Sequence, residues 1–327
     1  MRSGALLAAG HRMQPDPQAA SRPLTIVVTG ATGLIGSALV AHLRAEKHTV
    51  RRILHSPRAR EAGDVVWDPM RTALPADALA DADAVVHLAG EPVAHRWTEE
   101  RKRNIRESRV RATEQLARAV CALDVKPRVF LSGSAVGYYG DRGEEVLDET
   151  SSPGSDFLAR VCVDWENATQ PMSDAGVRVV LLRTGIVLSP RGGALARLLP
   201  IFRLGAGGPI GGGHQWMSWI GLRDHLRAMQ HALATDTLAG PVNLCAPNPV
   251  TNAEFATTLG RVLARPAILP VPALALELLY GEMASATLLA GQRAIPKALS
   301  ASGFTFSEPT LEGALRAEMR TSRKGQS

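Results

Sequence analysis

Cysteine and long hydrophobic runs are both scarce in this chain of 327 residues. The three cysteines, Cys121, Cys162 and Cys245, lie far apart, which excludes a Cys-x-x-C redox or metal motif. No apolar stretch approaches the ~18 residues of a membrane span, and the longest candidate, 271–279, is interrupted by a proline and a glutamate. The histidines show no metal-ligand spacing. We therefore expect a protein of the reducing cytoplasm, with no membrane partner and no metal.

Lysine is also rare, because only five of the 37 basic residues are lysines. The net charge of +6 and the pI near 9.6 would suit a nucleic-acid partner if the charge were clustered. The arginines are instead interleaved with acids. The densest cluster, 96–111, has helical spacing and contains glutamates, as on a solvated helix face. We expect no nucleic-acid binding, and part of the charge remains available to an anionic cofactor or substrate.

What the chain does contain is a glycine-rich turn between an apolar strand and an apolar helix, in the stretch 25–36. Gly30 permits a sharp turn, Gly33 a close approach to a pyrophosphate, and Gly36 packing of the helix on the strand. The free N–H groups at the helix start favour phosphate. The alternative is a turn with only a structural role. The pattern favours a dinucleotide site lined by Gly30, Thr32, Gly33, Leu34, Ile35 and Gly36.

The rest of the N-terminal half alternates strands with helices. Strands are expected at 49–54, 64–68, 83–90, 128–132 and 177–182, and helices at 98–123 and 153–175. This alternation predicts an α/β fold, a Rossmann doubly wound parallel sheet with helices on both faces. Ligands of such sheets bind at the carboxyl ends of the strands.

The composition changes after residue 188. Glycines crowd 189–219, which predicts a mobile loop region that closes on a substrate, or else a merely flexible connection. Further elements are expected as a strand at 242–244 and helices at 223–234, 252–263, 272–289 and 309–319. We predict a Rossmann domain of residues 23–188 with a returning segment at about 220–245. Residues 189–219 and 246–320 form a smaller, mixed α/β substrate region, and 1–22 and 321–327 are disordered tails.

The residues after the second strand bear on the cofactor. NAD-specific sites place an acid about 20 residues beyond the glycines, where it accepts hydrogen bonds from the ribose hydroxyls. Here that place holds His55, Ser56 and Arg58, and no acid appears before Glu61. Because these side chains attract a 2′-phosphate and a carboxylate would repel it, NADP(H) is favoured over NAD(H). The alternative is that Arg58 is only a solvated loop charge.

Several collinear motifs accompany the glycine turn. They are Leu88-Ala89-Gly90-Glu91-Pro92, Ser108-Arg109, Ser132-Gly133-Ser134-Ala135-Val136-Gly137-Tyr138-Tyr139-Gly140-Asp141, Leu182-Arg183-Thr184-Gly185 and Gly207-Gly208-Pro209-Ile210-Gly211. Together they resemble the extended, atypical short-chain dehydrogenase/reductase superfamily, and more narrowly its "epimerase family protein" group, over about residues 24–320. The resemblance implies an NADP(H)-binding Rossmann domain, a C-terminal domain of unknown function and a largely unassigned reaction.

The chain departs from the superfamily at its catalytic residues. The superfamily uses a serine with a Tyr-x-x-x-Lys pair, in which the tyrosinate is the general acid/base and the lysine lowers its pKa. If Glu166 matches the glutamate four residues beyond that lysine, the tyrosine position holds Leu158 and the lysine position holds Cys162. There is no lysine between Lys126 and Lys297. The standard dyad is therefore absent.

Other residues are candidates for the missing chemistry. Ser134 lies where the superfamily serine is expected, and Tyr138 and Tyr139 follow in the same loop. A phenol of ordinary pKa, about 10, is a poor base at neutral pH but can protonate an alkoxide in a dry site. Arg160 or the cofactor's charge would lower that pKa. Alternatively, one tyrosine packs in the core and the other caps the loop. Cys162 is more readily a buried structural thiol than a nucleophile.

The resemblance also implies roles by position. Leu88, Ala89 and Gly90 are expected beside the nicotinamide ribose and the pyrophosphate, with Asn104 and Arg109 pointing back to the cofactor. The ends of the later strands, at Ser132 and at Arg183 to Ile186 with Gly185, are expected at the cofactor, the latter at the nicotinamide. His214, Gln215 and Trp216 occupy the stretch where sugar-nucleotide enzymes place a diphosphate-binding arginine, which argues against a nucleotide-diphosphate substrate. The alternative for Trp216 is packing.

Three functions fit these patterns. The first is an NADP(H)-dependent oxidoreductase that acts on a small carbonyl or hydroxyl compound, with Ser134 and a phenol polarising the oxygen. The second is an epimerase that oxidises and re-reduces one carbon. The third is an NADPH-binding protein with a structural or sensing role and little catalysis. The sequence does not specify the oligomeric state.

Overall fold

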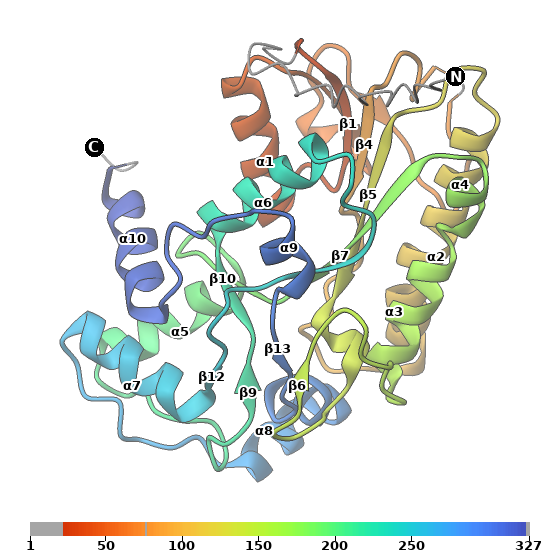
Figure 1. The fold of residues 1–327 in the computed structure, drawn as a ribbon. Helices are drawn as coiled ribbons and strands as arrows, with labels where there is room; N and C mark the ends of the chain where they lie inside the picture. Colours follow the sequence, from red (N-terminus) through yellow and green to blue (C-terminus); the bar gives the residue numbers. More distant parts are fainter. Residues whose placement is uncertain (1–21, 76, 325–327) are drawn as a thin grey trace, which may run out of the picture.

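A seven-stranded parallel sheet forms the centre of the computed structural model, which describes residues 22–75 and 77–324 (Figure 1). The strand order is β11-β7-β5-β4-β1-β2-β3, and every neighbouring pair runs parallel. The strands are β1 (Thr25–Thr29), β2 (Thr49–Leu54), β3 (Val65–Val66), β4 (Ala84–His87), β5 (Val129–Ala135), β7 (Arg178–Thr184) and β11 (Gly240–Leu244). The chain builds outward from β1 in one direction and then from β4 in the other. The order therefore reverses between β1 and β4, where ligands of doubly wound sheets bind.

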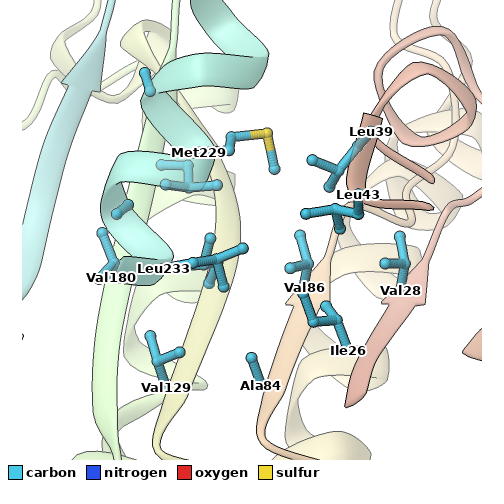
Figure 2. Close-up of a cluster of buried hydrophobic side chains, with 14 of the residues drawn as sticks. Ile26, Val28, Leu39, Leu43, Ala84, Val86, Val129, Val180, Met229 and Leu233 are labelled. Atoms are coloured by element: carbon cyan, nitrogen blue, oxygen red, sulfur yellow. The ribbon is translucent and has the colours of Figure 1, made fainter. Parts of the chain in front are cut away.

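One face of the sheet is covered by α1 (Leu34–Ala45) and α6 (Leu222–Ala234). Leu39 and Leu43 of α1 lie beside Met229 and Leu233 of α6, over the apolar side chains of the central strands (Figure 2). Neighbouring strand residues face opposite ways, as the two-residue repeat of a strand requires. Hence Ile26 and Val28 join this cluster and the residue between them does not.

The opposite face is covered mainly by α2 (Glu99–Cys121). Its Leu116 and Val120 pack on Val27 of β1 and Phe130 of β5, all nearly inaccessible to solvent. The sheet is thus buried on both faces, which explains the continuous apolar strands of the sequence. The predicted doubly wound Rossmann fold is confirmed.

A third apolar cluster lies beyond the sheet, on the left side of Figure 1. It joins α5 (Gly193–Arg203), α7 (Asn252–Leu263) and α10 (Leu311–Lys324) through residues such as Leu199, Phe255 and Leu315. The remaining elements include short helices and two-stranded sheets, some packed on the main sheet and others in this region. They are η1 (Pro57–Ala59), η2 (Val136–Tyr139), β6 (Val146–Leu147), α3 (Phe157–Asn167), α4 (Gln170–Asp174), β8 (Ile186–Leu188), β9 (Trp216–Met217), β10 (Trp219–Gly221), β12 (Val250–Thr251), α8 (Ala273–Tyr280), the π-helix η3 (Ala284–Leu288), β13 (Arg293–Ala294) and α9 (Lys297–Ala301).

The late segment of the chain returns to the loop that follows β5 and forms a separate two-stranded sheet there. Strand β13 pairs in parallel with β6, through Arg293 with Val146 and Ala294 with Leu147 (Figure 1). Nearby, Gln292 Nε2 donates to the carbonyl oxygen of Gly140 at 3.1 Å. These contacts tie the C-terminal region to the loop that follows β5.

The prediction of a loop over 189–219 is wrong for α5. In that helix Leu195, Leu199 and Phe202 recur at helical spacing and belong to the third cluster. The surrounding glycines obscure this helical period in the sequence. Two predicted helices are also divided. The helix expected at 153–175 becomes α3 and α4, with Pro171 near the start of α4, and the one expected at 272–289 is interrupted at Gly281, whose φ is 61°.

The predicted tails are only partly covered by the structure. Residues 1–21 and 325–327 lie outside the described part of the chain. Residues 321–324 were expected to be disordered, whereas α10 extends to Lys324. Within 22–75 and 77–324, no helix is long and apolar enough to cross a membrane.

Candidate functional site

The glycine turn between β1 and α1 is shaped by close backbone contacts. Gly30 has φ +67°, and a Cβ there would lie 2.6 Å from the carbonyl carbon of Leu88. A Cβ on Gly36 would lie 2.2 Å from the carbonyl oxygen of Gly30, so the helix packs directly on the turn. Gly33 is less confined, since its nearest contact would be at 3.4 Å. Among the described side chains none caps the start of α1, which leaves its first N–H groups available to an anion.

Two cavities meet at this turn. The first, of about 360 Å³, is called the Trp67 cavity. It is lined by the turn, the end of β2, the segment after β3 and the loop after β4: Thr29, Gly30, Ala31, Thr32, Gly33, Ile53, Leu54, His55, Trp67, Asp68, Pro69, Met70, Leu88, Ala89, Gly90, Glu91, Ser108 and Ala112.

The second, of about 410 Å³, is called the Ser134 cavity. It is lined by the turn, the start of α1, the ends of β5 and β7, and the start of α5: Gly30, Gly33, Leu34, Ile35, Gly36, Leu88, Gly133, Ser134, Trp165, Thr184, Ile186, Val187, Gly193 and Ala194. Gly30, Gly33 and Leu88 border both cavities. An elongated ligand can therefore cross the turn with one end in each cavity.

The loop after β4 is held to β1 by a buried hydroxyl. Thr29 Oγ1 lies 2.6 Å from His87 Nδ1 and accepts hydrogen bonds from the backbone N–H groups of Leu88 and Ala89. Burial, and then the charge of Arg109, lower the pKa of His87 to about 3, so its imidazole is neutral at physiological pH. This arrangement fixes the backbone of Leu88 to Gly90, which lines the Trp67 cavity.

A buried polar network stands behind Ser134. Ser134 Oγ donates to Glu166 Oε1 at 2.6 Å, and the two residues are 6% and 8% exposed. Arg183 donates two hydrogen bonds to the same carboxylate, from Nε to Oε1 at 2.9 Å and from Nη2 to Oε2 at 2.8 Å. Its guanidinium lies over the ring of Tyr138, 3.4 Å from the centroid. The ion pair of Glu166 and Arg183 joins α3 to β7 beneath the Ser134 cavity.

The network continues to the C-terminal region. Arg183 Nη1 donates to the hydroxyl of Tyr139 at 3.1 Å, and that hydroxyl donates to Asn243 Oδ1 at 2.7 Å. Asn243 Nδ2 in turn donates to the carbonyl oxygen of Ile295. Burial raises the pKa of Tyr139 to about 12, against the opposing effect of Arg183. Tyr139 is fully buried and lines neither cavity, which matches the alternative reading of one tyrosine in the core.

The two positions expected for the dyad lie in apolar surroundings, with Leu158 half-buried and Cys162 buried. Leu158 packs in a cluster with Val161, Tyr280 and Met283. Cys162 is buried beside the Ser134 hydroxyl, and burial raises the pKa of its thiol to about 12. A thiol of that pKa is not a nucleophile at neutral pH, which agrees with a structural Cys162. The expected influence of Arg160 on a phenol is not seen, because its Nη1 donates to the carbonyl oxygen of Ser155 instead.

The structure brings most predicted cofactor residues to the two cavities. Gly30, Thr32, Gly33, His55, Leu88, Ala89 and Gly90 line the Trp67 cavity, and Leu34, Ile35, Gly36 and Ser134 line the Ser134 cavity. Ser56 and Arg58 are exposed just beyond His55, where the backbone N–H of Arg58 donates to Ser56 Oγ. Thr184 and Ile186 line the Ser134 cavity as the strand-end prediction implies.

Several other predicted residues point elsewhere. Asn104 is exposed and lines a separate hollow with His95 and Arg96. Arg109 lies behind the loop after β4, where it donates to the carbonyl oxygen of Glu91 and stacks over Trp165. Because Arg183 alternates with Thr184 along β7, its side chain enters the network and not the cavity. Ser132 and Gly185 are buried or backbone-packed, with Gly185 against the carbonyl oxygen of Ser218.

The predicted substrate residues do not form one pocket. His214 is exposed, and Gln215 Nε2 donates to the carbonyl oxygens of Ile210 and Leu288. Trp216 donates to Glu144 Oε2 at 2.9 Å, and the guanidinium of Arg293 lies 4.1 Å from its ring centroid. These contacts join the C-terminal region to the loop after β5, so Gln215 and Trp216 act in packing here.

The sequence did not indicate that Trp165, Val187, Gly193 and Ala194 line the Ser134 cavity, or that Trp67, Pro69 and Met70 line the Trp67 cavity. Asp68 carried a signal, since it ends a predicted strand. Trp165 carried none, because a tryptophan in an amphipathic helix reads as core. Groups of three or more metal-ligating side chains are absent from 22–75 and 77–324.

Comparison with known proteins identifies the family. The profile of the NAD dependent epimerase/dehydratase family matches residues 26–245, and that of a domain of unknown function, DUF1731, matches residues 271–318. An epimerase family protein of Mycobacterium tuberculosis is 48% identical over 291 residues, which cover 89% of this chain and 96% of that protein. The human epimerase family protein SDR39U1 is 37% identical over 297 residues, covering 90% of this chain and 99% of the relative.

Solved structures agree with this assignment. The crystal structure of human SDR39U1 with NADPH has a TM-score of 0.83 at 35% identity, over 91% of this chain and 99% of that one. A nucleoside-diphosphate sugar epimerase from Corynebacterium glutamicum has a TM-score of 0.66 at 37% identity, over 93% of this chain and 67% of that one. The two matched profiles lie in the same order as the sheet region and the C-terminal region.

Proposed function

Because the chain belongs to the NAD-dependent epimerase/dehydratase family, we propose that it binds NADP(H) across the glycine turn as an oxidoreductase or epimerase-like enzyme. The substrate would be a small compound with a hydroxyl or carbonyl group. The observation that carries the proposal is the meeting of two cavities at Gly30 and Gly33, beside the uncapped start of α1. This geometry suits a pyrophosphate at the turn with a nucleoside on either side.

The preference for NADP(H) rests on the end of β2. His55 lines the Trp67 cavity, with Ser56 and Arg58 exposed next to it. A 2′-phosphate on the adenosine ribose would lie near these side chains. The exposed guanidinium of Arg58 would supply a cation and hydrogen-bond donors to this phosphate. The bound NADPH named for the human relative supports the same choice.

The Ser134 cavity would then hold the nicotinamide, whose chemistry when bound is hydride transfer to or from the substrate carbon. Leu34, Ile186 and Val187 make this cavity largely apolar. Ser134 is the candidate contact to the substrate oxygen. Tyr138 is half-buried under Arg183 and, like Tyr139, lies outside the lining of both cavities, but it remains a candidate acid, whereas the buried hydroxyl of Tyr139 suits a structural role better.

A second candidate is an NADPH-binding protein with a structural or sensing role and little catalysis. The observation in its favour is that Leu158 and Cys162, at the positions expected for the usual tyrosine and lysine, lie in apolar surroundings. This candidate predicts tight NADPH binding with no turnover over a broad carbonyl and alcohol panel. The cytoplasmic location and the absence of a nucleic-acid partner remain predictions.

The decisive experiment is mass spectrometry of the ligand retained through purification, followed by titration with NADPH and NADH. NADPH binding at least about 10-fold tighter than NADH is expected from one charge-assisted contact to the 2′-phosphate. Equal or tighter binding of NADH would overturn the cofactor assignment. NADPH oxidation with any carbonyl of the panel would favour the enzyme, and tight binding without turnover would favour the second candidate.

A further inference from the structure

The Ser134 cavity presents few polar side chains, and none of them offers a free proton to the open space of the cavity. Among the described lining residues the polar side chains are Ser134, Thr184 and Trp165. A serine hydroxyl has one proton to donate and two lone pairs to accept with. The partner that takes the proton therefore decides which kind of ligand group the hydroxyl can bind.

The proton of Ser134 goes to Glu166. The 2.6 Å separation from Oγ to Oε1 is that of a charge-assisted hydrogen bond, and both residues are more than nine-tenths buried. A carboxylate has no proton to give back, so Ser134 is the donor of this bond. The Cys162 thiol, which lies beside this hydroxyl, can use one lone pair of Oγ, and the other remains for the cavity that Ser134 lines.

Glu166 cannot readily turn away from Ser134. Its two oxygens are fixed by Nε and Nη2 of Arg183, at 2.9 and 2.8 Å. Arg183 is itself held by Tyr138 beneath its plane and by the hydroxyl of Tyr139. Such planar, two-point binding sets orientation as well as energy. Releasing Ser134 to donate into the cavity would leave one carboxylate hydrogen bond unmade in a buried site.

The remaining polar groups do not supply a side-chain donor either. Thr184 Oγ1 donates to the carbonyl oxygen of Leu182 at 3.2 Å and lies 3.3 Å from His225 Nε2. Whichever of these takes its proton, that proton stays within the protein. The Nε1 atom of Trp165 is buried and makes no hydrogen bond in the described structure, so it does not face the cavity's open space.

We propose that Glu166 is a positioning residue that turns Ser134 into a hydrogen-bond acceptor, so that the Ser134 cavity binds a donor group, O–H or N–H. A carbonyl oxygen, which only accepts hydrogen bonds, would face the lone pairs of Ser134 Oγ and could form no hydrogen bond with them. The inference deepens the proposed function and rests on it. The donor has two possible sources: the carboxamide N–H of a bound nicotinamide, or the hydroxyl of an alcohol substrate.

The first arm of the test concerns the carboxamide. NADPH and its 3-acetylpyridine analogue, in which a methyl ketone replaces the carboxamide, are titrated into the wild type and into Ser134→Ala. If the carboxamide is the donor, the substitution weakens NADPH about 3- to 10-fold, the range of one net hydrogen bond, and leaves the analogue within about 2-fold. Thr184→Val, which removes the other hydroxyl of the cavity, is the matched control.

The second arm concerns an alcohol. The NADP⁺ complex is titrated with trifluoroethanol, an O–H donor, and with dimethyl sulfoxide, which only accepts. If an alcohol hydroxyl is the donor, Ser134→Ala weakens trifluoroethanol about 3- to 10-fold, leaves dimethyl sulfoxide unchanged, and leaves both cofactors unchanged. A positive result in either arm supports the proposal and identifies the source of the donor group.

Glu166→Gln tests the positioning role. An amide N–H can donate to Ser134 Oγ and free the serine proton for the cavity. The expected result is an exchange of preference, with dimethyl sulfoxide strengthened and the donor ligand weakened, which a merely structural residue would not produce. Ser134→Ala leaves the pair of Glu166 and Arg183 intact, so it decides the question if Glu166→Gln does not fold.

Two results overturn the inference while leaving NADPH binding in place. One is Ser134→Ala with all four ligands unchanged. The other is an acceptor, dimethyl sulfoxide, weakened as much as or more than the donors. A wild type that binds no NADPH overturns the proposed function and the inference with it, so the two failures are distinguishable.

Discussion

Glu166 and Arg183 form a buried, two-point ion pair, with side chains 8% and 4% exposed. Burial opposes the charge of Arg183, but the hydrogen bond to Glu166 and its charge raise the pKa of Arg183 overall, so this guanidinium is charged at neutral pH. Removing one partner leaves the other charge buried and unpaired. The pair connects α3 with β7 and supports the residues beneath the Ser134 cavity, so stability and ligand binding both depend on it.

Breaking this pair should destabilise the fold. Arg183→Met is expected to lower the free energy of unfolding by about 3–5 kcal/mol, measured by urea denaturation. Arg106→Met is the matched control, because Arg106 of α2 forms an exposed salt bridge with Asp164, which lies on α3 as Glu166 does. That change should cost under about 1 kcal/mol. Equal losses in the two variants would show that the buried network adds no stability of its own.

The glycine turn should not tolerate a side chain at Gly36. A Cβ there would overlap the carbonyl oxygen of Gly30 at 2.2 Å, and backbone cannot yield as a flexible side chain does. Gly36→Ala should lower the free energy of unfolding by about 1–3 kcal/mol and abolish tight NADPH binding. Gly137→Ala, where a Cβ would meet only Leu158 at 3.8 Å, is the control and should leave stability within about 0.5 kcal/mol.

Cofactor selectivity should depend on Arg58. Arg58→Glu places a like charge near a 2′-phosphate and should reduce the ratio of NADPH to NADH affinity by about 10-fold or more, measured by fluorescence titration in low salt. Arg60→Glu makes the same charge change at an exposed position two residues later. If both variants reduce the ratio equally, the effect is long-range charge and Arg58 makes no specific contact.

The hydroxyl of Tyr139 should matter for stability. Tyr139→Phe leaves Asn243 Oδ1 and Arg183 Nη1 without that partner in a buried site, at an expected cost of about 1–3 kcal/mol in thermal or urea unfolding. Tyr138→Phe retains the ring beneath Arg183 and should cost less than about 0.5 kcal/mol. A larger loss in Tyr138→Phe than in Tyr139→Phe would contradict this division. Lost turnover in Tyr138→Phe alone would identify it as the acid.

Acid should destabilise the protein through buried imidazoles. Burial lowers the pKa of His225 to about 4, below its unfolded value of 6.5, so the unfolded state binds more protons between these values. The contribution of His225 is therefore complete above pH 6.5 and is lost as the pH falls toward 4, at up to about 1.4 kcal/mol per pH unit. His225→Leu should flatten this slope in urea titrations at several pH values. Replacing the exposed His214 by Asn should not.

The sequence alone determined the fold class and the location of the glycine turn at which a dinucleotide site is predicted. Both follow from local rules, because buried parallel strands need continuous apolar runs and a strand-turn-helix junction needs glycines where backbones touch. Residues 25–36 carried both signals. The α7 helix was likewise predicted with its bounds, 252–263, since its capping box of Thr251 and Glu254 is local.

Only the tertiary structure decided which side chains reach the site. Arg183 and Thr184 are neighbours in sequence, yet one enters the buried network and the other the cavity, since strand residues alternate faces. Trp165 lines the cavity from a helix whose sequence pattern indicates only packing. The commitment of the Ser134 proton to Glu166 joins residues 32 positions apart, and no local pattern specifies it. The sequence determined where the cofactor turn lies, and long-range packing decided which atoms face the ligand, because side-chain direction depends on contacts that the chain makes only when folded.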